Sequence, residues 1–280
     1  MGSPGPILCV LAAYMYFVKV WGPRWMADRP AFQLSGILIV YNVLMVLLST
    51  LFFVVGGRLT YLPGGHYDLV CEPVDYSSRP PATQILRVGW WFLLLKLVEL
   101  LDTVFFVLRK KQTHVSALHV THHSLVAWGV WIGLKFGGGG HSSFFPILNC
   151  AVHILMYSYY LLAALGPAVR RFLWWKRYLT LLQMAQFLVA AVHACLPLFF
   201  DCGYQPFFAY TLLAHAALFQ AMFYNFYHKS YFSKSSSSHS TSPPLSHSPS
   251  HPSHSPTLSC HRSHAQAIVR HLSDPVRKFD

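Results

Sequence analysis

Three histidines in the segment HVTHH at 119–123 have the side chains best suited to chemistry. His119, His122 and His123 lie at i, i+3 and i+4, so on a helix they share one face. Neutral imidazoles can ligate a transition metal, or they can act as nucleophile and general base because they titrate near neutrality. A chance cluster in a chain with 17 histidines is the alternative. We favour the chemical interpretation, because the cluster opens an apolar segment.

A second set of ionisable residues lies inside an apolar stretch, in KLVELLDT at 96–103. Lys96, Glu99 and Asp102 are spaced i, i+3 and i+6, and at 100° per residue they form a stripe on one side of a helix. A charge at mid-membrane costs roughly 2.5–3.5 kcal/mol, so such residues are functional-site candidates. The alternative is an ion-paired stripe that only orders the helices.

Polar residues also follow helical spacing in two later apolar segments. In NCAVHILMYSYY at 149–160 and TLLQMAQF at 180–187, the residues predicted to line a polar cavity are Asn149, His153, Tyr157, Tyr160, Gln183 and Gln186. A lone buried histidine or glutamine is more often a packing residue, and we interpret His193 and His215 that way. Several segments that each direct a polar stripe inward are harder to explain by packing.

These residues are set in a strongly apolar chain. Of its 280 residues, 54% are hydrophobic and 11% are charged, where about 25% charge is usual. That composition predicts an all-α membrane protein. The seven candidate spans are Ile7–Trp21, Gln33–Val55, Val88–Leu108, Leu118–Phe136, Phe144–Leu165, Tyr178–Phe200 and Pro206–Tyr227. A net charge of +12 could suggest nucleic acid, but the basic residues lie between the apolar runs, so we expect no such partner.

The basic residues predict the orientation in the membrane. Lysines and arginines concentrate in alternate loops, which should be cytosolic, so the N-terminus is expected on the lumenal side and the C-terminus in the cytosol. Two of the cationic clusters flank the polar segments and could bind the phosphates of an anionic ligand. They consist of Arg109, Lys110 and Lys111, and of Lys176 and Arg177.

The same topology puts two of the six cysteines in lumenal loops. Cys71 and Cys202 then share an oxidising compartment, and we predict a disulfide between them, with two free thiols as the alternative. No CxxC pair occurs, so a structural zinc site is not expected. Residues 1–232 are predicted to form the membrane domain. Residues 233–280, rich in Ser, His and Pro up to residue 264, are predicted to be a disordered cytosolic tail.

Taken together, these sequence motifs resemble those of the ELO family of very-long-chain fatty-acid elongases, the 3-oxoacyl-CoA synthases. The resemblance runs from about Tyr16 to Tyr231 and is carried by the motifs at 96–111, 119–123, 149–160 and 180–187. It implies seven spans in the endoplasmic reticulum membrane, with spans two to seven enclosing an acyl tunnel. It also implies an acyltransferase that condenses acyl-CoA with malonyl-CoA and releases carbon dioxide and CoA.

The resemblance further implies roles for individual residues. His122 is the implied nucleophile and His153 its partner across the cavity. In the mechanism that we expect, the donors that stabilise the developing oxyanion are His119, His123, His153 and Asn149. No metal or other cofactor is implied beyond the substrates acyl-CoA and malonyl-CoA. The implied partners are the lipid bilayer and the 3-ketoacyl reductase, dehydratase and enoyl reductase of the elongation cycle, and a homodimer stays open. A di-iron histidine-box oxidase, a lipid transporter and an inactive partner subunit are the alternatives.

Overall fold

The computed structural model describes residues 2–232, with the side chain of residue 170 left out. Throughout that stretch every regular element is helical. The α-helices are α1 (Gly5–Tyr16), α2 (Gly22–Met26), α3 (Ser35–Leu59), α4 (Pro80–Val98), α5 (Leu101–Leu108), α6 (Ala117–Phe136), α7 (Phe144–Ala164), α8 (Lys176–Phe199) and α9 (Pro206–Tyr231). The predicted tail, 233–280, lies outside the described residues.

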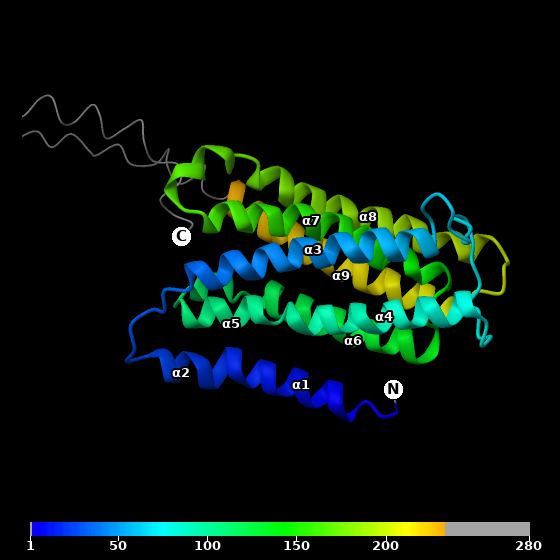
Figure 1. Ribbon diagram of the computed structural model, residues 1–280, viewed down its shortest axis with the longest axis horizontal. Coiled ribbons are helices and arrows are strands. Elements are labelled where there is room, and N and C mark those ends of the chain that lie inside the picture. Colours follow the sequence, from blue (N-terminus) through cyan, green and yellow to red (C-terminus); the bar gives the residue numbers. More distant parts are fainter. Residues whose placement is uncertain (1, 233–280) are drawn as a thin grey trace, which may run out of the picture. The chain divides into compact units, whose positions relative to one another are not determined.

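The long helices run alongside one another (Figure 1). α3 packs on α7, α8 packs on α9, and α4 packs on α6. α1 and α2 lie at the edge of the bundle, where α1 contacts α6 and α2 contacts α5. A π-helical turn at Phe17–Trp21 joins α1 to α2, so the first apolar segment is one rod from Gly5 to Met26. That rod is longer than the predicted span Ile7–Trp21.

Within residues 2–232, five helical segments are long and apolar enough to cross a membrane. They are Gly5–Met26, Ser35–Leu59, Gly140–Ala164, Lys176–Phe199 and Pro206–Tyr231. The predicted spans Val88–Leu108 and Leu118–Phe136 fall outside this set. Both carry the polar groups of the candidate site: Lys96, Glu99 and Asp102 in the first and the three histidines of 119–123 in the second. An apolar segment that contains such residues has a lower mean hydropathy than a span without them.

The predicted span Val88–Leu108 is not one helix, and on this point the sequence interpretation was wrong. α4 ends at Val98 and α5 begins at Leu101. At the junction the amides of Leu100 and Asp102 bond to carbonyls three residues back, at 3.3 and 3.2 Å. Such 3₁₀-type bonds reduce the turn to about three residues, which aligns side chains at i and i+3. The tightening therefore begins after Lys96 and brings Glu99 and Asp102 closer to one line than an α-helix does.

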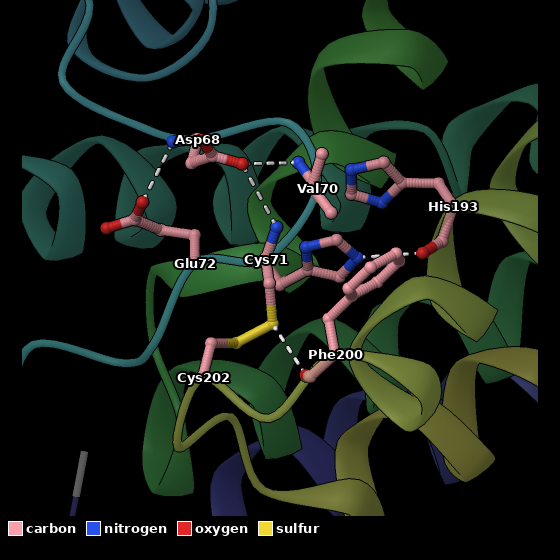
Figure 2. The surroundings of a disulfide bond; sticks show 8 residues. Asp68, Val70, Cys71, Glu72, His193, Phe200 and Cys202 are labelled. Atoms are coloured by element: carbon pink, nitrogen blue, oxygen red, sulfur yellow. Dashed lines mark hydrogen bonds between the residues drawn. A yellow bond between two sulfur atoms is a disulfide. The ribbon is translucent and has the colours of Figure 1, made fainter.

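Two loops at one end of the bundle are joined by a disulfide (Figure 2). Cys71 follows α3 and Cys202 precedes α9, and their Cα atoms are 6.0 Å apart. The carboxylate of Asp68 accepts hydrogen bonds from the amides of Val70 and Cys71, at 2.6 and 3.2 Å, which orders the first loop. The bond links residues 131 positions apart. It therefore ties the α3–α4 loop to the α8–α9 turn.

We expect Cys202→Ser to lower the free energy of unfolding by about 2–5 kcal/mol, because the link restricts a long loop in the unfolded chain. Thermal unfolding in detergent, with and without reductant, measures the effect. Reductant should lower the Tm of the wild type to that of the variant and leave the variant unchanged. Cys9→Ser, at an exposed free thiol, is the matched control. Equal Tm values for wild type and Cys202→Ser would contradict the expectation.

Candidate functional site

A buried chain of polar side chains connects α4 to α7. Lys96 Nζ donates to Glu99 Oε1 at 2.7 Å and to Asn149 Oδ1 at 2.7 Å. Glu99 Oε1 also lies 3.1 Å from His153 Nδ1. Each of these four residues is at most 6% exposed. The cost of burying the lysine and the glutamate is offset only because each charge has a partner and a hydrogen bond.

This chain fixes the hydrogen-bonding state of His153. A carboxylate only accepts hydrogen bonds, so the neutral imidazole donates from Nδ1 to Glu99. The lone pair is then on Nε2, where it can accept a proton or a hydrogen bond. Glu99 therefore orients His153 and determines its tautomer, which is the arrangement that a general base requires.

Asp102 belongs to a separate cluster. Tyr157 Oη donates to Asp102 Oδ2 at 2.7 Å, and both side chains are buried. Next to it, the hydroxyls of Tyr14 and Thr103 lie 2.7 Å apart, which connects α1 to α5. The stripe predicted from the sequence is thus divided, with Lys96 and Glu99 bonded to α7 residues around His153, and Asp102 bonded to Tyr157.

The three histidines of 119–123 lie in the first turns of α6. Ser116 is the N-cap and accepts a hydrogen bond from the amide of His119 at 3.2 Å, so the helix begins just ahead of the cluster. The rings of His119 and His123 are 4.4 Å apart between centroids, and those of His122 and His123 are 5.5 Å apart. His119 also packs on Phe106 of α5, at 5.4 Å. The cluster is therefore one contiguous group of imidazoles.

His122 differs from its neighbours in what surrounds it. Its ring lies 4.7 Å from that of Phe219 and about 6 Å from those of Phe187 and Phe223, so α8 and α9 cover it with aromatic groups. Among the described residues, His122 Nδ1 and His119 Nε2 are buried nitrogens without a hydrogen-bond partner. A buried imidazole nitrogen with no partner is costly for a purely structural residue. It is available to a ligand or a reacting group.

The other predicted cavity residues are placed less uniformly. Gln183 Nε2 lies 3.3 Å from Met156 Sδ, so its amide faces α7, and Gln186 is buried on α8. The ring of Tyr160 is 6.0 Å from that of Tyr157, but 37% of the residue is exposed. Tyr160 is therefore the least enclosed of the set.

The predicted cationic residues lie at helix ends. Arg109, Lys110 and Lys111 follow α5, and Lys176 and Arg177 open α8. Figure 1 draws the end of α5 and the α7–α8 turn on the same side, opposite the loops joined by the disulfide. Lys110 has a φ of 54° and its Nζ donates to the carbonyl of Ala27 at 3.0 Å. Arg177 Nε donates to Tyr227 Oη at 2.7 Å.

An apolar cavity of about 190 Å³ adjoins the polar cluster. Its described lining comes from α3, α4, α6, α7, α9 and the turn at Gly140–Ser143, with no residue of α8. Phe92 and Phe219 both line it, and they contact Lys96 Nζ and the ring of His122, at 4.7 Å in each case. One end of the cavity therefore adjoins the histidines and the buried ion pair.

The sequence analysis missed several members of this site. The phenylalanines around His122 occupy ordinary apolar positions, and no signal in the sequence separates them from other packing residues. Tyr14 and Tyr41 also contribute, the latter with a 3.4 Å bond to the carbonyl of Val98 at the end of α4. His193, expected to be a packing residue, stacks on His141 at 3.8 Å between ring centroids, near the disulfide (Figure 2).

Comparisons with known proteins show which family the chain belongs to. Residues 1–239 match the family model ELO, described as the GNS1/SUR4 family. A very long chain fatty acid elongase of Aedes aegypti is 47% identical over 82% of this chain, but the match spans only 64% of that relative's length. Very long chain fatty acid elongase 7 of Drosophila melanogaster is also 47% identical, covering 82% of this chain and 70% of its own. Very long chain fatty acid elongase 1 of Mus musculus is 42% identical, covering 82% and 83%. With a match over most of its length and these identities, the chain belongs to the ELO (GNS1/SUR4) family.

Proposed function

We propose that this protein is a very-long-chain fatty-acid elongase that condenses long-chain acyl-CoA with malonyl-CoA. The observation that carries the proposal is an apolar cavity whose lining residues Phe219 and Phe92 contact His122 and Lys96. Lys96 is bonded to Glu99, and Glu99 to His153. An acyl chain fits the apolar walls, and the reacting carbonyl would then lie beside the imidazoles. The relatives described above are all named very long chain fatty acid elongases, which supports the same activity.

In the first step His122 attacks the thioester carbonyl of acyl-CoA. A bond forms between the acyl carbon and an imidazole nitrogen, the carbon–sulfur bond breaks, and the imidazole proton goes to the CoA thiolate. We propose that His153 moves that proton, because its bond to Glu99 leaves the lone pair on Nε2. This step stores the acyl group on the enzyme and divides one difficult reaction into two.

In the second step malonyl-CoA takes the place of CoA. Loss of carbon dioxide leaves an enolate, whose α-carbon attacks the acyl-imidazole carbonyl. The carbon–nitrogen bond then breaks as the leaving imidazole nitrogen takes up a proton from solvent, which yields 3-oxoacyl-CoA and restores neutral His122. His119, His123 and Asn149 are the donors proposed to stabilise the developing oxyanion. The proposed sequence of steps uses no metal or redox cofactor.

The proposed membrane arrangement has seven spans in the endoplasmic reticulum. One polar span would consist of α4 and α5, and the other of α6. The five apolar helices would enclose these two spans, and spans two to seven would form the acyl tunnel. The cationic helix ends would face the cytosol and the disulfide the lumen, which follows the positive-inside rule and the usual location of disulfides. The product would pass to a 3-ketoacyl reductase, a dehydratase and an enoyl reductase. A homodimer is compatible with this arrangement.

The cationic residues after α5 are proposed to bind the CoA phosphates. We expect Lys111→Gln and Arg109→Gln each to raise KM for acyl-CoA about fivefold, as losing roughly 1 kcal/mol from a partly exposed charged contact would do. The effect should shrink at high salt, because salt screens exposed charges.

Kinetics in microsomes at two salt concentrations measure this effect. The control is Arg58→Gln. Arg58 is an exposed residue in the last turn of α3. A fall in kcat with an unchanged KM would contradict phosphate binding by these residues.

The proposed activity is tested with malonyl-CoA labelled on the two carbons that it donates. Microsomes containing the full chain are given a panel of acyl-CoAs, and the products are analysed by mass spectrometry. The expected result is 3-oxoacyl-CoA, or its elongated derivatives, with two labelled carbons beyond each accepted primer. Folded, membrane-inserted protein that extends no primer would contradict the proposal.

A further inference from the structure

Two glycines on α6 leave open space along the wall of the apolar cavity. Gly129 and Gly133 lie at i and i+4 and both line the cavity. A Cβ atom built at Gly133 meets no heavy atom within 4 Å outside its own helix turn. One built at Gly129 meets only His215 Nε2, at 3.7 Å, which is an ordinary van der Waals contact. A larger side chain at either position could therefore enter the cavity without displacing protein atoms at its Cβ.

At other positions in the cavity wall, glycine is required for a different reason. A Cβ at Gly89 would lie 2.5 Å from a methyl carbon of Leu134, and one at Gly137 would lie 2.5 Å from the ring of Phe208. Those positions are glycine because protein packs directly on their backbone. At Gly129 and Gly133 the space is not filled by protein, although glycine destabilises the interior of a helix relative to alanine. The open volume itself is the feature that these two glycines provide.

Both glycines stand on the face of α6 that carries His122. They follow it by seven and eleven residues, which are i+7 and i+11 positions, and Val126 at i+4 also lines the cavity. At 1.5 Å per residue, Gly129 lies about 10 Å and Gly133 about 16 Å along the helix axis from the proposed nucleophile. They therefore mark two depths of one cavity, measured from the reacting end.

We propose that Gly129 and Gly133 determine the longest acyl chain that the enzyme accepts, by keeping the cavity open at these two depths. The inference rests on the proposed function and assigns its chain-length specificity to named residues. An acyl group held at His122 extends along this face of α6, past Gly129 and then Gly133. A side chain at Gly133 blocks only the far part of that path, and one at Gly129 blocks it nearer the thioester.

The test compares Gly129→Leu and Gly133→Leu with wild type in the full chain, in microsomes, with saturated acyl-CoAs of increasing length and labelled malonyl-CoA. The longest accepted primer should become shorter in both variants, and by more in Gly129→Leu. For the longest wild-type primer, kcat/KM should fall about tenfold or more, the size of effect that one misfitting methylene produces in an apolar pocket. Short primers should keep their wild-type kcat/KM.

Gly36→Leu is the matched control, because Gly36 is an exposed glycine of α3 with open space around it and lies outside the cavity wall. It should keep the wild-type length profile. Leucine variants that keep this profile would overturn the inference, as would a greater shortening in Gly133→Leu than in Gly129→Leu. If the leucine variants fail to fold, Gly129→Ala and Gly133→Ala are compared with wild type instead. The measured quantity is the ratio of the longest product to the next longest, which should fall in both variants. A wild type that extends no primer refutes the proposed function instead, so the two failures are distinguishable.

Discussion

His122→Ala is expected to reduce elongation on the order of 10⁴-fold or more, since removing a covalent nucleophile costs that much in enzymes that form acyl intermediates. The other imidazoles would remain in place, because His119 and His123 contact each other and His153 is held by Glu99. Without a nucleophile they have no acyl group to stabilise. Labelled malonyl-CoA incorporation measures the loss.

Two further variants separate chemistry from packing at this position. His122→Gln keeps a polar side chain against the ring of Phe219 and should be as inactive as His122→Ala. His66→Ala, at an exposed loop histidine, should retain full activity. All three proteins should remain folded, as judged by their Tm in detergent. Elongation in His122→Ala within tenfold of wild type would rule out a nucleophilic role.

Glu99→Gln is expected to cause the largest loss of stability in the site, about 3–5 kcal/mol, because it leaves Lys96 buried without its charge partner. Lys96 is 3% exposed and would keep neutral acceptors, Asn149 among them, but no negatively charged partner. The variant should also lose activity, since His153 loses the carboxylate that fixes its tautomer. Thermal unfolding in detergent and the elongation assay measure the two effects.

A matched control and a compensating variant make this expectation specific. Asp28→Asn removes an exposed carboxylate and should change stability by no more than about 0.5 kcal/mol. The double variant Lys96→Met with Glu99→Gln removes both charges and should recover part of the stability, but not the activity. Glu99→Gln with wild-type stability would show that the negative charge of Glu99 is not needed to compensate buried Lys96.

The helices could be predicted where apolar runs end at clear signals. The predicted span Phe144–Leu165 differs by one residue from α7, and the predicted start at Pro206 is the first residue of α9, where proline favours the first helical turn. The break between α4 and α5 could not be predicted, because KLVELLDT has no proline or glycine there. Its cause is the local change to 3₁₀-type bonding, which an apolar pattern does not encode.

The polar members of the site could be identified because charged groups in an apolar helix need a buried partner. The partners themselves could not, since they depend on the rotation of each helix about its axis. Lys96 bonds to Asn149, whereas Asp102 bonds to Tyr157, and nothing in the spacing distinguishes these pairings. The open space beside Gly129 also depends on which helices face α6, so it becomes visible only in three dimensions.

The most direct test of the account is to look for the acyl group on His122. Purified full-length protein in detergent is incubated with acyl-CoA alone, and then chased with malonyl-CoA labelled on its two donated carbons. Peptide mass spectrometry should find an acyl adduct on His122, with CoA released before malonyl-CoA is added. The chase should remove the adduct and yield 3-oxoacyl-CoA with two labelled carbons. An adduct on another residue, or labelled product formed without CoA release in the first step, would contradict the account.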